Sequence, residues 1–264
     1  MESLDAKFKK ELDGRDILFV SKYEKVVGRL GRKVKRYHAS SMEEIDKDFA
    51  PIQADLKRQI YRCLKTHGAA CYSMGRAHGH IEVLNFRPKS LAALPNEGIN
   101  IFILPQEAHK AIDRRELVLS GNVSEDIIAR IKELMRQKLN ATLSAPEVEK
   151  GIAGALKSAR ERGSLISITE STYYYNRGRI ASFKEDDVQY VQFSAVMDMR
   201  TSEQCRSRHR LVMRLDDPDL AANTPPLHGR CRSILRPYYG KVEPGMLDWS
   251  HTVPLPAGWN QGAA

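Results

Sequence analysis

The sequence has little of several features, and each shortage excludes a class of protein. Its 264 residues include four cysteines and two tryptophans, and aromatic residues make up 7%. No apolar run approaches the ~20 residues that a bilayer-spanning helix needs. The first ten residues mix both charge signs, which is not typical of a secretory signal. We therefore expect a chain made and kept in a cytosol, where cysteines are usually reduced thiols or metal ligands.

Sequence signatures of common catalytic sites are also missing. The chain contains no G-x-x-x-x-G-K-[ST], no H-E-x-x-H and no G-x-S-x-G. Apolar residues make up 42% and charged residues 28%, as in an ordinary globular protein. The length fits one large domain or two small ones.

Positive charge is concentrated near the start of the chain. The formal net charge is +9, and residues 1–100 contain 19 basic against 13 acidic side chains. Such a field attracts polyanions and acidic protein surfaces without sequence preference. The densest stretch, 22–36, is either a binding arm for nucleic acid or a partner, or simply a solvated face. Its basic residues are Lys22, Lys25, Arg29, Arg32, Lys33, Lys35 and Arg36.

Apolar periodicity predicts a mainly helical chain up to about residue 181, after a loosely organised start over 1–41. Serine caps and glycine stops divide the pattern into separate helices. The predicted helices cover 53–85, 106–119 (ending at Ser120 and Gly121), a segment capped by Ser124, a segment from Ser144 to Gly163, and 165–181. On the first of these, Cys63, His67, Cys71, His78 and His80 could suggest a metal site. Their spacing over several turns favours a buried core stripe instead.

The C-terminal part has a different pattern, with short strands and loops in place of long helices. Residues 188–196 predict a strand, 198–226 a polar loop, and 231–235 a second short strand that ends before Pro237. The fold class is therefore α+β, with a mainly helical N-terminal region followed by a helical core with a small β-sheet near the C-terminus. A loop over 86–104, closing with an extended segment at 99–104, places the preferred domain boundary near residue 100. The expected divisions are a basic helical region 1–100, a core 101–240 and a Pro-rich tail 241–264.

The segment 198–232 is chemically the densest. His228 and Cys231 have the H-x-x-C spacing that can chelate one ion from a tight turn, and Cys205 could approach from the other end of the loop. Thiolate and imidazole suit tetrahedral zinc, with Asp198, His209 or water as the fourth ligand. The alternative is a loop held by hydrogen bonds, in which His228 bonds a carbonyl, Arg232 pairs with Asp198 and the cysteines are apolar filler. Both interpretations stay open.

Five short blocks in order carry a resemblance to a known family. They are Thr169-Glu170, Asn176-x-Gly178-Arg179, Asp198-x-Arg200-Thr201, Cys205, and Pro225-Pro226-x-His228-x-x-Cys231-Arg232. This order resembles the phage Mu F-like head morphogenesis family, which are minor head proteins of tailed phages, over about residues 105–237. The chain departs from many members in having Ser202 and Ser233 where they have cysteines, so only part of a Cys/His knuckle remains.

The resemblance implies a structural component and not an enzyme. It implies a low-copy virion protein, associated with the portal vertex or the head interior and acting in head assembly and DNA packaging or delivery. The expected partners are the portal protein, other head proteins and, non-specifically, packaged DNA, with no membrane. The protein would occupy the virion head, and the host cytoplasm during assembly. Zinc at Cys205, His228 and Cys231 is the only cofactor that the residues suggest.

Two other functions compete with this interpretation. Glu170, Asp198, Arg200, His228 and Arg232 could converge as a metal-dependent site acting on a phosphodiester or a nucleotide. Alternatively, the tyrosines at 173–175, beside Arg177 and Arg179, could stack bases in a non-specific nucleic-acid-binding module.

Overall fold

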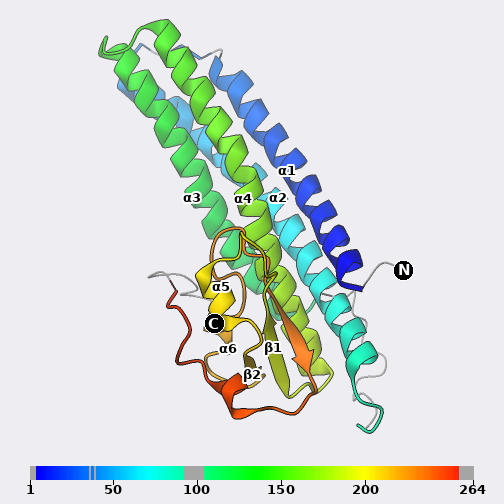
Figure 1. The fold of residues 1–264 in the computed structure, drawn as a ribbon. Helices are drawn as coiled ribbons and strands as arrows, with labels where there is room; N and C mark the ends of the chain where they lie inside the picture. Colours follow the sequence, from blue (N-terminus) through cyan, green and yellow to red (C-terminus); the bar gives the residue numbers. More distant parts are fainter. Residues whose placement is uncertain (1–3, 36, 39, 92–103, 256–264) are drawn as a thin grey trace. The chain divides into compact units, whose positions relative to one another are not determined.

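The computed structural model describes residues 4–35, 37–38, 40–91 and 104–255. Four long helices precede a small antiparallel sheet of three strands (Figure 1), which confirms the predicted α+β fold. The helices are α1 (Leu4–Lys35), α2 (Met42–Phe86), α3 (Gln106–Leu139), α4 (Ala145–Glu185), α5 (Glu203–Arg208) and α6 (Leu220–Asn223), and a 3-10 turn covers Pro244–Leu247.

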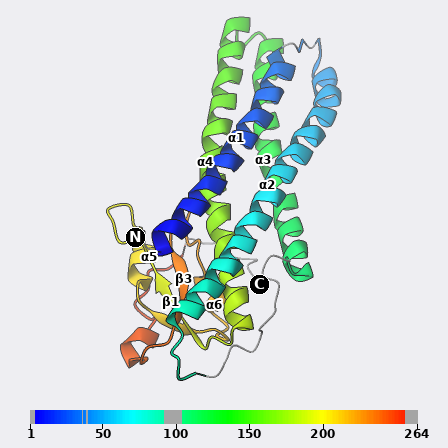
Figure 2. The same ribbon diagram turned by 90° about the vertical axis from the view of Figure 1, so that its right-hand side faces the viewer.

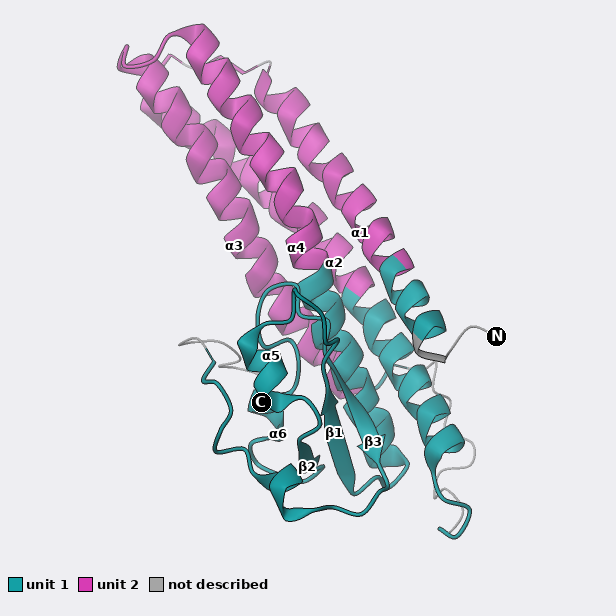
Figure 3. Cartoon of the chain, viewed as in Figure 1, with its two compact units in different colours: residues 1–13, 68–105, 168–264 teal, residues 14–67, 106–167 magenta. Residues whose placement is uncertain are grey.

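The chain forms two compact units (Figure 3). The bundle unit consists of residues 14–67 and 106–167, and the sheet unit consists of 1–13, 68–105 and 168–264. Helices α1, α2 and α4 each contribute a segment to both units. Segments of the two units therefore alternate along the chain. The regions expected from the sequence were instead consecutive: 1–100, 101–240 and 241–264. The expected boundary near residue 100 and most of the extended segment at 99–104 lie outside the described residues.

Residues 4–35 form one long helix, α1, so the expectation of a loosely organised 1–41 was wrong over that range. Within the bundle unit, apolar side chains of α1 recur every three or four residues and are buried in the core. Among them, Tyr23, Val27 and Leu30 are at most 4% exposed. Exposed lysines and arginines alternate with these buried positions and conceal the apolar stripe in the sequence. Figure 2 shows the course of α1 as one continuous helix.

Helix α3 does not break at Ser120-Gly121, and Ser124 does not cap a new helix. The Ser120 hydroxyl donates to the Leu117 carbonyl at 3.1 Å, and Ser124 donates to the Gly121 carbonyl at 2.9 Å. Both serines therefore bond within α3, where Ser120 was expected to end one helix and Ser124 to cap the next.

Helix α4 begins where expected and continues past Gly163. Ser144 precedes it, and the Glu147 carboxylate accepts from both the Ser144 N–H (2.8 Å) and its hydroxyl (2.6 Å). Gly163 lies inside the helix, and a Cβ on it would be only 2.7 Å from the ring of Tyr23. The glycine serves close packing against α1 within the bundle unit, and the predicted stop was wrong.

The sheet has the strand order β2-β1-β3, with β1 Tyr190–Ser194, β2 Val212–Arg214 and β3 Ile234–Tyr238. Strand β1 falls inside the predicted 188–196. Strand β3 starts later than the predicted 231 and runs through Pro237, which is opposite Val191 in the register. The expected polar loop 198–226 in fact contains α5, β2 and α6. The short polar elements there lack the periodicity that a sequence pattern needs.

The described part of the Pro-rich tail, up to residue 255, packs on the sheet unit. The Trp249 indole donates to the Val212 carbonyl at 2.9 Å, and the Arg208 guanidinium donates to the Val253 carbonyl at 2.8 Å. Across the described residues, none of the helices has both the length and the apolar character that a membrane crossing requires.

Candidate functional site

One polar face of α4 binds the main chain that leads into β3. Thr169, Thr172, Asn176 and Arg179 are spaced by three or four residues, so their side chains share a face of the helix. Each bonds a backbone group of residues 230–235. The bonds are Arg230 N to Thr169 Oγ1 (3.1 Å), Thr172 Oγ1 to Cys231 O (2.6 Å), Asn176 Nδ2 to Ser233 O (3.2 Å), Leu235 N to Asn176 Oδ1 (2.9 Å) and Arg179 Nε to Leu235 O (2.8 Å).

Asn176 lies at the centre of this face. It is fully buried, and its amide both donates to Ser233 O and accepts from Leu235 N. Sequence reasoning selected Thr169, Asn176 and Arg179 from the family pattern but missed Thr172. The three-and-four spacing of these residues was the signal that could have identified it.

Gly178 allows two helices to approach closely in the sheet unit. A Cβ on Gly178 would lie 2.0 Å from the Tyr72 carbonyl oxygen of α2. Gly75 of α2 is in the same position toward α4, where a Cβ would lie 2.0 Å from the Tyr175 carbonyl oxygen. The glycine of the Asn-x-Gly-Arg block is therefore required for packing between main chains.

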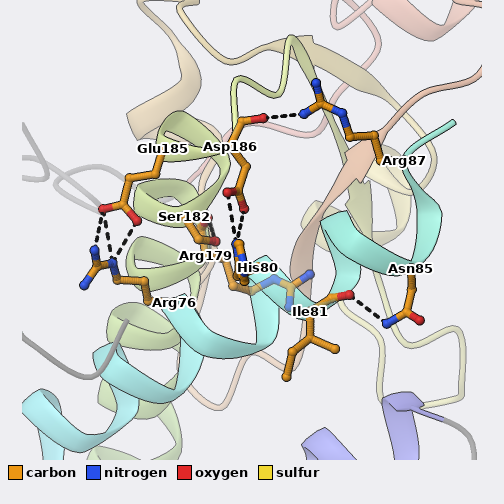
Figure 4. Close-up of polar contacts among 9 residues, drawn as sticks. All are labelled: Arg76, His80, Ile81, Asn85, Arg87, Arg179, Ser182, Glu185 and Asp186. Atoms are coloured by element: carbon orange, nitrogen blue, oxygen red, sulfur yellow. Dashed lines mark hydrogen bonds and ion pairs between the residues drawn. The ribbon is translucent and has the colours of Figure 1, made fainter. Parts of the chain in front are cut away.

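Two ion pairs join the same two helices, and Figure 4 shows the pair between Arg76 and the partly exposed Glu185. The Arg179 guanidinium pairs with Glu82, and both side chains are at most 1% exposed. Arg76 pairs with Glu185 at 2.9 Å. Such pairs hold a fixed geometry, because removing one partner would leave a buried charge uncompensated.

Asp186, at the end of α4, completes this set. Its carboxylate contacts His80 Nδ1 at 2.8 Å, and its carbonyl accepts from Arg87 at 2.9 Å (Figure 4). Burial raises the pKa of the Asp186 carboxyl, and His80 partly offsets that rise. Like the Arg179–Glu82 pair, these contacts connect α2 to α4.

Asp198 and Arg232 form a two-pronged ion pair across the dense segment. The two guanidinium nitrogens donate to the two carboxylate oxygens at 2.8 and 2.7 Å. Arg232 is the main reason why the pKa of Asp198 lies well below its usual value. The same carboxylate accepts from the Arg200 N–H at 2.9 Å, and the Asp198 N–H donates to Thr201 Oγ1 at 2.9 Å. The Asp-x-Arg-Thr block is thus a turn fastened to Arg232, while the Arg200 side chain is exposed.

Cys205, His228 and Cys231 come together beside this pair. The Cys205 sulfur lies 3.6 Å from the Cys231 sulfur and 3.3 Å from His228 Nε2, and both cysteines are buried. His228 Nδ1 donates to the Gly229 carbonyl at 2.8 Å, which directs Nε2 toward Cys205. Pro226, the remaining motif residue, is buried in the same loop. We call these three side chains the thiol cluster.

The thiol cluster favours one negative charge, on Cys205. A hydrogen bond from Cys231, reinforced by His228, lowers the pKa of Cys205 to about 4. The same hydrogen bond and burial raise the pKa of Cys231 well above its usual value. The bond to Cys205 also raises the pKa of His228. Cys205 is therefore the group of the cluster that ionises most readily, with a thiol and an imidazole ring in contact with its sulfur.

The cluster has the size of a zinc site. Two thiolates on one tetrahedral Zn²⁺ at about 2.3 Å lie about 3.8 Å apart, and a thiolate and an imidazole nitrogen lie about 3.5 Å apart. The distances of 3.6 and 3.3 Å are close to both values. Within the described part of the chain, this is the only group of three or more potential ligands with such geometry. The other candidates are committed elsewhere, since Asp198 pairs with Arg232 and His209 Nδ1 accepts from the Ala195 N–H at 3.2 Å.

The histidines of α2 have other partners. His67 contacts the Ser167 carbonyl at 3.4 Å, and His78 Nδ1 and Nε2 contact the Tyr175 hydroxyl at 3.0 Å and Glu11 at 2.9 Å. Leu56, Ile60 and Leu64 of the same stripe are buried in the bundle core. These contacts support the core interpretation of that helix.

The residues of the two competing functions are placed differently. Tyr173, Tyr174 and Tyr175 are all at most 9% exposed, so they present no face on which bases could stack. For the enzymatic alternative, Arg200, His228 and Arg232 line one small recess, but Glu170 is buried in α4 and does not line it.

The basic residues of 22–36 lie on α1 and are exposed wherever they are described. Arg29 donates to Gln59 at 3.0 Å, and Lys33 pairs with Asp55 at 3.0 Å. Arg36 lies outside the described residues. The solvated face and the binding arm are both compatible with this placement.

Comparison with known families adds one finding. Residues 114–236 match the family model described as Phage Mu protein F like protein. No curated protein and no solved structure matches the chain. The matched range begins in α3 and ends in β3, and it contains the polar face of α4, the Asp198–Arg232 pair and the thiol cluster. The segment 114–236 therefore belongs to the phage Mu protein F-like family, a family of phage head morphogenesis proteins.

Proposed function

We propose that the chain is a structural minor head protein of a tailed phage, located in the virion at the portal vertex or in the head interior. There it would act in head assembly and in DNA packaging or delivery. The observation that supports this most directly is the use of the motif residues. Thr169, Asn176 and Arg179 bind main-chain groups, and Asp198 binds Arg232. These groups fix the fold of the segment that defines the family.

The exposed cations of α1 supply the docking surface in this proposal. Six lysines and arginines between positions 22 and 35 face solvent on one helix. They would contact acidic surfaces of the portal or other head proteins, or phosphates of packaged DNA without sequence preference. Binding to DNA through such contacts falls steeply as salt rises.

We also propose that the thiol cluster binds one Zn²⁺ with structural effect, the fourth ligand being water. Metal analysis of protein purified without chelators tests this, with an expected content of about one zinc per chain. Cys231→Ser should lose the metal, whereas Cys63→Ser, a cysteine outside the cluster, should retain it. Zinc well below one per chain, or equal content in both variants, would reject the site.

The proposal excludes catalysis. Asp198 would need a free carboxylate to act as a base or to hold a metal, but both of its oxygens accept from Arg232. Incubation with plasmid DNA and with nucleoside triphosphates, in Mg²⁺ or Mn²⁺, should show no turnover. Metal-dependent turnover that disappears in Asp198→Ala would favour the enzyme instead.

Location is tested on particles. Mass spectrometry of gradient-purified virions and procapsids should find the chain at a few copies per particle. A charge-reversed variant, Lys22→Glu/Lys25→Glu, should fold normally by circular dichroism and be depleted from particles. A wild-type chain that is absent from both particle types would contradict the proposed function.

A further inference from the structure

The bundle unit contains an open groove that the family motif does not explain. Its volume is about 580 Å³, within the range of ligand-binding pockets. It is lined by the C-terminal parts of α1 and α3, the start of α2 and the N-terminal part of α4. Its apolar floor consists of Val34, Ile45, Met135, Val148, Ile152 and Leu156.

The rim of this groove is positively charged. Arg32 and Lys35 of α1, Lys138 of α3 and Arg160 of α4 line it, against one acidic side chain, Glu149. All four cations are exposed. Within the described part of the chain, none of the four forms an ion pair or a side-chain hydrogen bond.

Neighbouring cations on the same helices behave differently. Lys33 pairs with Asp55 at 3.0 Å, and Lys132 pairs with Asp46 at 2.7 Å. Arg162 pairs with Asp126. The bundle unit therefore supplies carboxylates to cations around the groove but not to the four that line it.

Gly28 shows that two of these cations converge. A Cβ at Gly28 would be 3.9 Å from an Arg160 guanidinium nitrogen and 4.0 Å from an Arg32 guanidinium nitrogen. Two like charges thus flank one point above a residue with no side chain. A carboxylate at that point could accept from both guanidinium groups.

We infer that the groove docks an acidic amphipathic helix of another head protein. The floor would take the apolar side chains of such a helix, and the rim would take its glutamates or aspartates. The lining positions on α4 run from 145 to 160, and 16 residues of helix span about 24 Å. That length suits about four turns of a helix. DNA would leave the apolar floor unused.

The inference rests on the proposed docking role of α1 and names the chemistry of one partner. Its probe is a labelled 16-residue peptide with leucines at i, i+3, i+4 and i+7 and glutamates on the flanks. We expect saturable binding to the full chain at about 150 mM salt, measured by fluorescence anisotropy. A scrambled peptide of the same composition should bind at least tenfold more weakly. Equal binding of the two peptides would overturn the inference.

Two pairs of variants locate the binding. Gly28→Leu would fill the groove without meeting backbone and should weaken binding at least tenfold. Gly14→Leu, on the same helix where a Cβ meets nothing within 4 Å, should bind as wild type. Arg32→Glu/Arg160→Glu should abolish binding.

The matched charge control is Lys10→Glu/Arg15→Glu, two exposed cations of α1 outside both the groove and residues 22–36, which makes the same charge change and should retain binding. Equal loss of peptide binding in both double variants would overturn the inference. So would displacement of the peptide, at similar concentrations, by duplex DNA or by the fatty acid dodecanoate, because the groove would then bind another class of ligand. If Arg32→Glu/Arg160→Glu loses peptide binding but is incorporated into particles as wild type, the groove is not a docking site for a head protein, and the proposed function stands. Absence of the wild-type chain from particles would reject the function itself.

Discussion

Replacing Asn176 by alanine should destabilise the sheet unit more than any single surface change. The substitution removes the acceptor for the Leu235 N–H (2.9 Å) and the donor to the Ser233 carbonyl (3.2 Å). All three residues are at most 2% exposed, so solvent does not replace the lost partners. Each buried group left unsatisfied costs about 1–3 kcal/mol, which gives about 2–6 kcal/mol in total.

Urea unfolding followed by far-UV circular dichroism measures the free energy of unfolding. Hydrogen exchange of the Leu235 amide locates the effect, because this proton should exchange much faster in the variant. Asn85→Ala is the matched control, since Asn85 is exposed and bonds only the Ile81 carbonyl one turn away (2.7 Å). The control should change stability by less than about 0.5 kcal/mol. A loss below about 1 kcal/mol in Asn176→Ala, with unchanged exchange at Leu235, would refute the clamping role of α4.

Three further predictions concern other contacts of the sheet unit. Because Arg232 holds the pKa of Asp198 below its ordinary value, the pair stabilises the folded state above about pH 4 and this contribution is lost as pH falls. Unfolding titrations between pH 6 and 2 should therefore show a steeper acid loss in wild type than in Asp198→Asn, and parallel curves would contradict the pair. Gly178→Ala should cost about 3 kcal/mol or more by thermal unfolding, since its Cβ would meet the backbone of α2, whereas Gly154→Ala has open space and should stabilise by up to about 1 kcal/mol. His228→Ala should cost about 1–3 kcal/mol, because the Gly229 carbonyl and Cys205 lose a partner, and an unchanged melting temperature would count against it.

The sequence predicted the fold class, the first strand and the stripe that α2 buries, because these depend on local periodicity. It failed where long-range packing decides. Gly163 reads as a helix stop, yet its missing side chain makes room for Tyr23 from a helix about 140 residues away in sequence. Ser120 was misread for a local reason, since a serine hydroxyl can either cap a helix or bond within it.

The site was predictable in part. Spacing and family pattern predicted that Cys205, His228 and Cys231 could meet and that Arg232 could pair with Asp198, and the structure brings both groups together. The partner of Arg179 was not predictable, because Glu82 lies on another helix and nothing in its local sequence marks it. The sequence showed Arg32, Lys35, Lys138 and Arg160 only as basic residues. Which lysines and arginines have a carboxylate within reach depends on the fold, so the groove could not be predicted.

The hydrogen bonds between α4 and β3 have a consequence for how the protein behaves at high concentration. Leu235 turns both its N–H and its carbonyl toward α4, and the next position with that orientation is Pro237, which has no N–H to offer. A β-strand of a neighbouring molecule would therefore find no usable donors along this stretch. At high protein concentration, sheets with open edges tend to add strands from neighbouring molecules. In this chain, Asn176 and Arg179 of α4 occupy the free hydrogen-bonding groups of Leu235, and Pro237 offers no N–H. Strand addition along this stretch of β3 is therefore disfavoured.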